Sequence, residues 1–282
     1  MILLKKIFQK QFLIIKIERE GLGGNNYLIK KDLITRVISS IFLIILALLF
    51  NYLGELYFFS AVALVSIVLL YEFYKLFNAE IIDKKFLFNS VIGLISITFV
   101  FYEFYIFFVY LLFAGLFLSI SFSKNHYFLV IIPFIYIFSP LAALIYLNSY
   151  TDGKLLICWI FAVVWTVDIS GYIFGKSLKG PKLIPSISPN KTWSGFIAGI
   201  FLAGFFSIIY SYFLELGEYI KYFVLGFTGA ILSVAGDLFE SKLKRINKKK
   251  DSSNLVPGHG GLLDRLDGFL FAILYFWMLS FI

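Results

Sequence analysis

Residues 236–268 combine the residue types that bind a metal ion and phosphates together. This polar stretch reads GDLFESKLKRINKKKDSSNLVPGHGGLLDRLDG in a chain that is 60% hydrophobic. It holds seven Lys or Arg residues, a Gly-x-Gly-Gly turn that begins at Gly258, and one of the two histidines, His259. Its five carboxylates are Asp237, Glu240, Asp251, Asp264 and Asp267. Carboxylates mixed with cations beside a flexible glycine loop are suited to holding Mg²⁺ and several phosphate groups.

Four of these acids form two pairs with helical spacing. Asp237 and Glu240 are three residues apart at the inner end of one predicted membrane span. Asp264 and Asp267 repeat this spacing at the inner start of the next span. Residues spaced i, i+3 share one face of a helix, so each pair directs two acids the same way. Mg²⁺ takes one or two carboxylates plus substrate phosphates, which makes the two pairs candidate metal ligands.

The helix dipole offers a plainer explanation for one pair only. Acids at a helix N-terminus are favoured by about 0.3–1 kcal/mol, which can account for Asp264 and Asp267. Acids at a helix C-terminus meet the unfavourable end of the dipole, so Asp237 and Glu240 need another reason for their position. We therefore expect this second pair to serve chemistry.

Asp168 is an acid inside an apolar segment. It is the fourteenth residue of 155–174, roughly 9 Å inside the cytoplasmic end at about 1.5 Å per residue. A bare carboxylate within a membrane costs about 2.5–3.5 kcal/mol, so it must face a partner or a water-filled cavity. A buried hydrogen bond to another helix would satisfy it. We favour a functional role beside the acid pairs, which lie at the same depth.

A run of basic residues follows Glu240 and is suited to phosphates or to lipid headgroups. Its members are Lys242, Lys244, Arg245, Lys248, Lys249 and Lys250. Such a run gains about 1 kcal/mol per residue near an anionic leaflet, and Lys248 and Lys249 suit that role. Lys244, Arg245 and Lys250 stand closest in sequence to acids and are expected to face the site.

The two histidines give weaker signals. His259 can serve as a general base, as a phosphate contact, or as a turn residue bonded to its own loop. His126 stands beside Lys124 in a short polar loop and is interpreted as an interfacial residue.

A second polar stretch, residues 174–195, reads FGKSLKGPKLIPSISPNKTWSG. It holds three of the six prolines and four lysines, with hydroxyl groups at Ser186, Ser188 and Thr192. Proline excludes regular helix, so we predict a stiff, irregular loop. Hydroxyl donors around Lys191 suit a phosphate or a nucleotide. A basic linker that touches headgroups would have the same composition.

Composition identifies a membrane setting. The chain is 20% aromatic and 15% charged, with a mean hydropathy of +0.90. A soluble fold could not hide 35 Phe and 18 Tyr in one core with so little polar cover, and no nucleic acid partner is expected. The one cysteine, Cys158, excludes an internal disulfide. We predict an all-α, polytopic integral membrane protein with about nine transmembrane helices.

Apolar runs long enough to cross about 30 Å of hydrocarbon predict the spans 34–53, 55–74, 86–103, 105–123, 127–148, 155–175, 195–214, 220–238 and 265–282, with eight to ten spans allowed. With a cytoplasmic N-terminus, only Lys154 and Lys221 of the 25 Lys and Arg residues fall on the outer side. This bias supports that orientation. It also brings the loops 175–194 and 239–264 to the same cytoplasmic face.

Three regions follow from this organisation. Residues 1–32 are predicted to be a basic cytoplasmic extension on the headgroups. Residues 33–154 form the N-terminal transmembrane helices, which we expect to contact membrane lipid chains and to offer candidate dimer contacts. Residues 155–282 form the catalytic transmembrane domain, with both cytoplasmic loops.

Taken together, the polar motifs resemble the phosphatidate cytidylyltransferase, or CDP-diacylglycerol synthase, family. The motifs are S-x-L-K-R from 241, K-D-S-S from 250, P-G-H-G-G-L-L-D-R-L-D from 257, G-D-L-F-E-S from 236 and S-P-N-K-T-W from 188. Asp168 with Gly171 and Tyr172 extends the likeness over residues 160–270. The chain departs from the family at Val256, Asn190 and Gly171, where a bulkier aliphatic, a basic residue and alanine are usual.

The resemblance implies that CTP and phosphatidic acid give CDP-diacylglycerol and pyrophosphate, with Mg²⁺, on the cytoplasmic side of the inner membrane. It also implies a second, monovalent cation such as K⁺ and a homodimer. The metal ligands it implies are Asp237 and Asp264, followed by Asp168 and Asp267. The catalytic residues it implies are Asp264, Asp237, Lys244, Arg245 and His259. The substrate-binding residues it implies are Ser188, Asn190, Lys191, Thr192, Ser241, Lys250 and Arg265.

Three rival functions stay open at this stage. A related nucleotidyltransferase that acts on an isoprenoid-ether lipid phosphate would carry the same site residues. A transporter would need charged or helix-breaking residues at mid-depth in several spans, whereas here they cluster at one face. A non-catalytic scaffold would leave the site acids unexplained.

Overall fold

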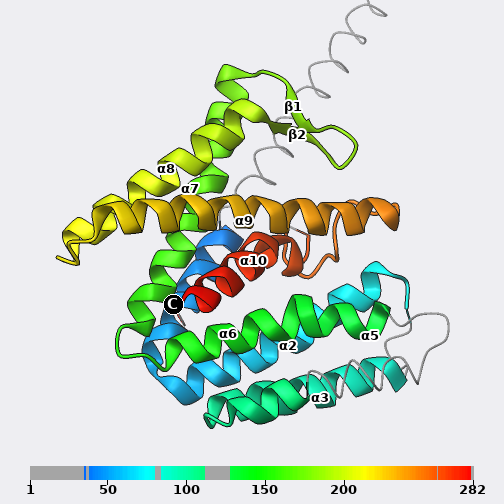
Figure 1. Cartoon of the computed structure of the whole chain (residues 1–282). Helices are drawn as coiled ribbons and strands as arrows, with labels where there is room; N and C mark the ends of the chain where they lie inside the picture. Colours follow the sequence, from blue (N-terminus) through cyan, green and yellow to red (C-terminus); the bar gives the residue numbers. More distant parts are fainter. Residues whose placement is uncertain (1–34, 36–37, 80–83, 112–127, 259, 281–282) are drawn as a thin grey trace, which may run out of the picture.

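The computed structural model describes residues 35, 38–79, 84–111, 128–258 and 260–280, and nearly all of its regular structure is helical (Figure 1). The elements are the helix Ile38–Leu53, α2 (Glu55–Leu76), α3 (Lys84–Phe101), α5 (Phe128–Pro133), η1 (Phe134–Phe138), α6 (Ser139–Asn148), α7 (Gly153–Leu178), β1 (Lys182–Ile184), β2 (Ser188–Thr192), α8 (Trp193–Phe213), α9 (Tyr219–Ile246) and α10 (Leu263–Leu279). The predicted N-terminal extension 1–32, His126 and His259 lie outside the described residues.

Six helices are long and apolar enough to cross a membrane within the described ranges. They are α2, α3, the continuous helix Phe128–Asn148, α7, α8 and α9. Helix Ile38–Leu53 is shorter, α10 has 17 residues, and most of the predicted span 105–123 lies outside the described residues. The structure confirms a largely helical protein with several helices long and apolar enough to span a membrane, but it does not confirm the count of nine or the side of the N-terminus.

The helix Phe128–Asn148 contains a π-helical turn, η1, directly after Pro133. Proline has no backbone N–H to donate to the preceding turn, and a π-turn is one way in which a helix accommodates that loss. The buried side chains of η1 include Tyr136, whose ring packs against Phe239 of α9 and Phe271 of α10. This helix therefore packs against both α9 and α10.

Close helix crossings hold α7, α8, α9 and α10 together. A Cβ on Gly195 of α8 would lie 2.4 Å from the carbonyl oxygen of Gly171 in α7, which is too close for any side chain. A Cβ on Gly236 of α9 would lie 2.5 Å from the carbonyl oxygen of Asp267 in α10. Small residues allow membrane helices to approach at such contacts. At the second crossing, the backbone of α9 next to Asp237 is in contact with the backbone of Asp267 in α10.

The loop predicted to be irregular is in fact a β-hairpin. Helix α7 continues to Leu178, and β1 then pairs antiparallel with β2, with Lys182 opposite Thr192 and Ile184 opposite Ser188. The prediction was wrong because prolines need not disrupt a ladder this short. Pro185 lies in the turn, and Pro189 stands between the paired positions of β2.

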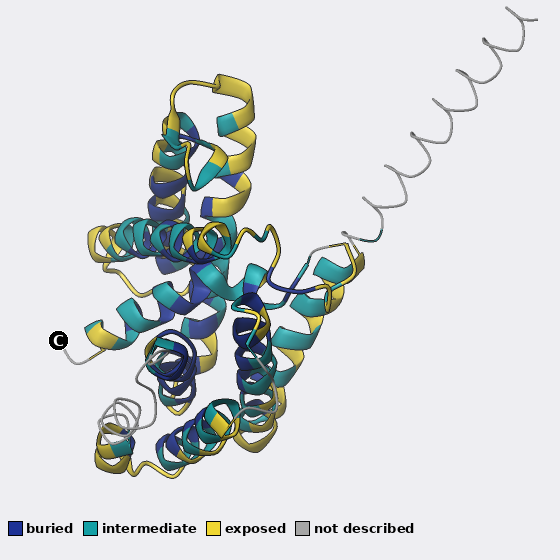
Figure 2. Cartoon of the chain, turned by 90° about the vertical axis from the view of Figure 1, so that its right-hand side faces the viewer, coloured by how far each residue is buried: buried dark blue, intermediate teal, exposed yellow. Residues whose placement is uncertain are grey.

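The ends of several helices meet at one edge of the molecule, on the right in Figure 1. The C-terminal ends of α2 and α9, the N-terminal end of α10 and the hairpin all lie toward this edge. Buried residues gather where the helices meet, and exposed residues cover their outer faces (Figure 2). Many exposed side chains are large and apolar, as a lipid-facing surface requires.

Candidate active site

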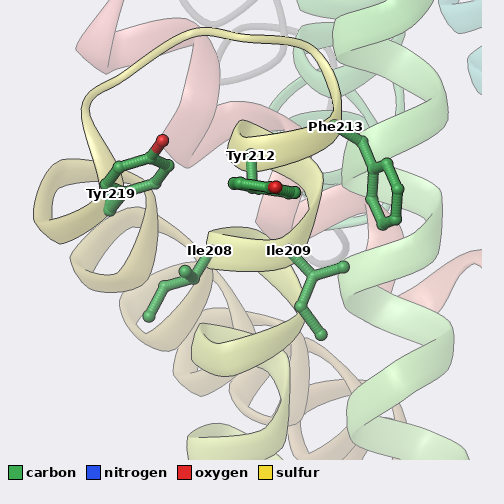
Figure 3. A pocket seen from close by; sticks show the side chains of 5 residues that line it. All are labelled: Ile208, Ile209, Tyr212, Phe213 and Tyr219. Carbon is green, nitrogen blue, oxygen red and sulfur yellow. The ribbon is translucent and has the colours of Figure 1, made fainter.

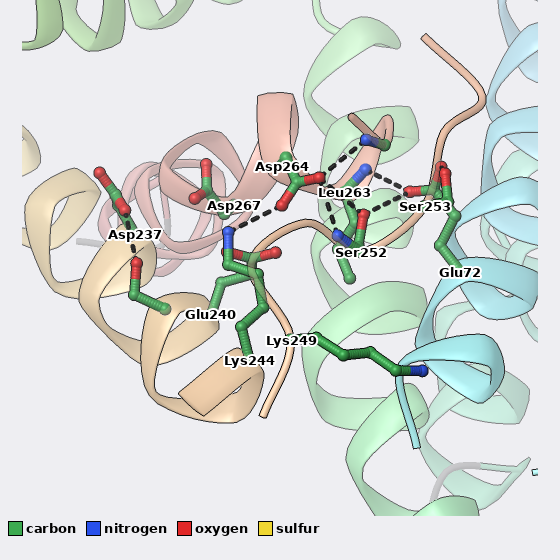
Figure 4. Close-up of polar contacts among 12 residues, drawn as sticks. Glu72, Asp237, Glu240, Lys244, Lys249, Ser252, Ser253, Leu263, Asp264 and Asp267 are labelled. Atoms are coloured by element: carbon green, nitrogen blue, oxygen red, sulfur yellow. Dashed lines mark hydrogen bonds and ion pairs between the residues drawn. The ribbon is translucent and has the colours of Figure 1, made fainter. Parts of the chain in front are cut away.

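Asp264, in the first turn of α10, is the most extensively bonded acid of the site (Figure 4). Its Oδ1 accepts a hydrogen bond of 2.7 Å from Nζ of Lys244. Its Oδ2 accepts from the backbone N–H of Ser252 at 3.0 Å, the Ser252 hydroxyl at 3.0 Å and the backbone N–H of Gly261 at 2.7 Å. With 5% of its side chain exposed, Asp264 is a fixed, ionised acceptor at the edge of the loop 247–262.

Glu240 and Lys244 form a buried ion pair one helical turn apart on α9. Glu240 is fully buried, and neither of its carboxylate oxygens has a hydrogen-bond partner among the residues that the structure describes. Lys244, 12% exposed, therefore compensates two acids, Glu240 and Asp264, from different helices. A single ammonium between two carboxylates connects the end of α9 to the start of α10.

Asp237 faces the hairpin, away from Asp264 (Figure 4). Its Oδ2 pairs with Nζ of Lys191 on β2, and its Oδ1 accepts a hydrogen bond of 3.3 Å from the Ser241 hydroxyl. The side chains of Asp237 and Lys191 are 29% and 27% exposed. The hairpin and helix α9 thus meet at a partly open ion pair.

Asp168 and Asp267 complete the acidic group. Asp168 is exposed on α7, within electrostatic range of Asp237, Lys191 and Arg265. One oxygen of Asp267 accepts a hydrogen bond of 2.8 Å from the next backbone N–H, that of Gly268. Asp267 and Asp264 therefore engage different partners, although their spacing puts them on the same side of α10.

The position predicted for Asp237 and Glu240 needs a correction. Helix α9 does not end near these acids but continues to Ile246, so both lie more than a turn inside it. The sequence F-E-S-K-L-K-R-I is polar but still periodic, and Leu243 is buried against the core. The unfavourable helix-end dipole therefore does not apply to them. Their position is instead compensated by Lys191 and Lys244.

The predicted phosphate-binding residues of the hairpin differ in their accessibility. Ser188 and Lys191 are half-buried and Asn190 is exposed. Thr192 is buried and caps α8, because its side-chain oxygen accepts a hydrogen bond of 3.2 Å from the backbone N–H of Gly195. Its hydroxyl has a structural task as an N-cap.

The basic residues at the end of α9, in the loop after it and at the start of α10 also have different roles. Arg245 donates from Nε to the carbonyl oxygen of Ile187, at 3.2 Å, and so connects α9 to the hairpin turn. Lys250 and Arg265 are exposed. Lys249 was assigned to headgroups, but its Nζ donates to the carbonyl oxygen of Lys75 and to Oδ1 of Asn78, where α2 ends.

Sequence reasoning missed Glu72, a fully buried acid of α2 that contacts the loop 247–262. The available signal was the one used for Asp168, a single carboxylate inside an apolar segment, here in Y-E-F-Y-K-L. Glu72 shows that the region 33–154 contributes a side chain to this polar cluster as well as apolar helices.

Two glycines of the Gly-x-Gly-Gly turn allow the loop to approach the acids. Gly260 has φ +89°, in the left-handed region, and a Cβ there would lie 2.8 Å from Oδ2 of Asp264. A Cβ on Gly261 would lie 1.9 Å from the Ser252 hydroxyl. A side chain at either position would displace groups that donate hydrogen bonds to Asp264.

The four predicted metal ligands do not form a ready-made metal site. In the part of the chain that the structure describes, no group of three or more His, Cys, Asp or Glu residues is placed to hold a metal ion. Asp237 and Asp264 are each met by a lysine ammonium instead. The donor set nevertheless fits Mg²⁺, since this ion prefers carboxylate oxygens and takes only one or two of them together with phosphates.

An apolar pocket of about 490 Å³ lies where α8 ends and α9 begins, at the opposite end of α9 from these acids (Figure 3). Its lining is Ile208, Ile209, Tyr212, Phe213 and Tyr219. It offers no carboxylate or cation for phosphate chemistry, so we place the candidate site at the acids.

Comparison with known proteins agrees with the motifs. Residues 34–282 match the Cytidylyltransferase family, and the chain belongs to this family. It is 43% identical over 157 residues to a phosphatidate cytidylyltransferase of Rickettsia bellii, covering 52% of this chain and 66% of the relative. It is 39% identical over 155 residues to that of Rickettsia typhi, covering 52% and 67%. It is 42% identical over 135 residues to that of Brucella abortus, covering 48% and 50%. The chain thus spans about two thirds or less of the length of these relatives.

Proposed function

We propose that this protein transfers a cytidylyl group from CTP to phosphatidic acid, with CDP-diacylglycerol and pyrophosphate as products. The observation that carries the proposal is that the β1–β2 hairpin contacts helix α9 at a group of acids and cations, in a chain of the Cytidylyltransferase family. In this reaction a phosphate oxygen of the lipid attacks the α-phosphorus of CTP. The bond to the β-phosphate breaks, and pyrophosphate leaves.

Positive charge is the main requirement of this reaction, because both substrates are anions. Lys191 enters from the hairpin, and Lys244 and Arg245 enter from α9. Held cations of this kind neutralise the triphosphate and the leaving group without reorganisation during the reaction. Ser188, Asn190 and Lys250 lie at or near the surface beside them and are proposed phosphate contacts.

We propose Mg²⁺ as the cofactor, with Asp237 and Asp264 as the first candidate ligands and Asp168 and Asp267 as further candidates, of which the ion would take one or two together with phosphates. When bound, the ion would neutralise phosphate charge and orient the triphosphate. In the structure Nζ of Lys191 pairs with Asp237 and Nζ of Lys244 pairs with Asp264, so each of these carboxylates already binds one cation. A monovalent second cation and a homodimer stay predictions from the family resemblance.

The membrane setting suits a lipid substrate. Phosphatidic acid keeps its acyl chains in the leaflet, so its headgroup must meet CTP at the membrane surface. The helices that bear the acids also expose many large apolar side chains. We propose that the site faces the cytoplasm at the inner membrane, where the basic loops lie under the positive-inside rule.

Conversion of labelled CTP to a chloroform-soluble product tests the proposal. Purified protein with phosphatidic acid and Mg²⁺ is expected to move label into the lipid phase, and EDTA is expected to stop the transfer. Absence of label with folded protein would contradict phosphatidic acid as the acceptor. Label with an isoprenoid-ether lipid phosphate instead would assign the other acceptor, and no label with either would point away from nucleotidyl transfer.

A further inference from the structure

Glu72 is a fully buried carboxylate near the C-terminal end of α2, and it is surrounded by hydrogen-bond donors of one distant loop (Figure 4). Its Oε1 accepts from the Ser253 hydroxyl at 2.6 Å and from the backbone N–H of Leu262 at 2.9 Å. Its Oε2 accepts from the backbone N–H of Leu263 at 2.6 Å, with the Ser252 hydroxyl at 3.3 Å. Both oxygens are therefore satisfied, as burial of a charge demands.

Two of these donors are the backbone N–H groups at the start of α10. Leu262 is the residue that precedes the helix and Leu263 is its first residue, and neither N–H has a partner inside the helix. The positive end of the helix dipole adds to the attraction for an anion. Glu72 thus supplies, from a helix about 190 residues earlier, a second anion at this helix start, in addition to Asp264 of its first turn.

The same loop connects Glu72 to Asp264. The Ser252 hydroxyl lies between Oε2 of Glu72, at 3.3 Å, and Oδ2 of Asp264, at 3.0 Å. A hydroxyl has one proton, so the shorter contact to Asp264 takes it. Gly261 donates to Asp264, and a Cβ at this glycine would lie 2.6 Å from Oε2 of Glu72. The donors that orient Asp264 and those that bind Glu72 are thus neighbours on one backbone.

We infer that Glu72 is a positioning residue. It fixes the start of α10 and the loop 252–263 so that the carboxylate of Asp264 points toward the side where it binds Nζ of Lys244 and would bind a metal ion. This inference rests on the proposed function for its kinetic consequences. Glu72 is fully buried, and the donors of the loop and of the start of α10 occupy both of its oxygens. It acts through Ser253, Leu262 and Leu263, and its loss would leave the carboxylate of Asp264 unchanged but its orientation less fixed.

The test uses Glu72→Gln, with Glu55→Gln as the matched control because Glu55 is an exposed acid at the other end of the same helix. Mn²⁺ serves as the probe ion and is measured by electron paramagnetic resonance without CTP or lipid. Loss of groups that orient a ligand weakens metal binding by about 10–100-fold, and we expect Glu72→Gln to raise the Kd for Mn²⁺ by about that factor. Glu55→Gln should leave this Kd unchanged.

Two further readouts separate positioning from a general loss of fold. Hydrogen exchange of Glu72→Gln should accelerate in residues 252–264 and stay unchanged in α8. In turnover, the Mg²⁺ concentration for half-maximal rate should rise by about 10-fold or more, whereas the KM for CTP should change by less than about 3-fold. Glu72→Asp should recover part of the Mn²⁺ affinity, because it keeps the charge.

Ser253→Ala provides a second variant if Glu72→Gln fails to fold. It removes one hydrogen bond to Glu72 and none to Asp264, so a smaller shift of the Mn²⁺ Kd in the same direction is expected. Unchanged Mn²⁺ affinity in folded Glu72→Gln or in folded Ser253→Ala would overturn the inference. If wild-type protein turns over no CTP while Glu72→Gln still weakens Mn²⁺ binding, the proposed function fails and the positioning role stands.

Discussion

Lys244→Met removes the ammonium that compensates two acids at once. Lys244 is 12% exposed, Glu240 is fully buried and Asp264 is 5% exposed. Asp264 keeps three hydrogen bonds to Oδ2 after the substitution, but Glu240 has no other hydrogen-bond partner among the described residues. The variant therefore leaves a buried carboxyl group that has to take up a proton, at a cost in free energy, or stay charged without compensation.

Breaking a buried ion pair by removing one partner costs about 3–5 kcal/mol. Because Lys244 retains some exposure, we expect a loss near the lower end, about 3 kcal/mol in the free energy of unfolding. For a chain of this size about 1 kcal/mol corresponds to roughly 2–4 °C in Tm, so the expected decrease is about 6–12 °C. Thermal unfolding in detergent, followed by intrinsic tryptophan fluorescence to which the buried Trp159 contributes, measures it.

Two companion variants decide whether charge is the cause. Lys242→Met alters an exposed lysine of the same helix and should shift the free energy of unfolding by less than about 0.5 kcal/mol. Adding Glu240→Gln to Lys244→Met removes the unpaired charge and should restore at least half of the lost Tm. A Lys244→Met protein as stable as wild type, or a double variant less stable than the single one, would refute this reasoning.

The remaining predictions concern the loop and the hairpin. Gly261→Ala places a Cβ 1.9 Å from the Ser252 hydroxyl and should cost about 1–3 kcal/mol by thermal unfolding, whereas Gly171→Ala, whose Cβ meets its nearest neighbour at 3.7 Å, should be tolerated; equal Tm values for the two would contradict the crowded loop. Lys191→Met should raise the KM for CTP by about 10–100-fold through loss of a charged contact, whereas Lys182→Met, an exposed lysine on the partner strand, should not; an unchanged KM in Lys191→Met would remove that residue from the nucleotide site.

Much of the architecture could be predicted from sequence because hydropathy acts locally. Apolar runs of about twenty residues identify helices regardless of their neighbours, and the motif residues near 188, 237 and 264 were placed in two loops or helix ends. The structure brings these loops together through Lys191 with Asp237 and Arg245 with Ile187. The family resemblance is confirmed by the match over residues 34–282.

Features set by distant contacts could not be predicted. The hairpin depends on pairing between two strands of three and five residues, too short to show a strand pattern and interrupted by Pro185 in the turn and Pro189 in β2. The length of α9 was underestimated because its last two turns are polar, although Leu243 packs in the core. Glu72 was overlooked because the segment around it is apolar on average, and its hydrogen-bond partners lie 180–191 residues away in the sequence. The side of the membrane that the N-terminus occupies stays a prediction.

The measurement that tests the central claim most directly is cytidylyl transfer from labelled CTP to phosphatidic acid by Asp264→Asn. The amide can keep an oxygen toward Ser252 and Gly261 but turns its NH₂ toward Nζ of Lys244, so charge is lost at the centre of the site. We expect a protein that inserts and unfolds cooperatively like wild type, with no detectable label in the lipid phase. Wild-type transfer by this variant would show that the reaction does not depend on the acids that the loop 247–262 and helices α9 and α10 bring together.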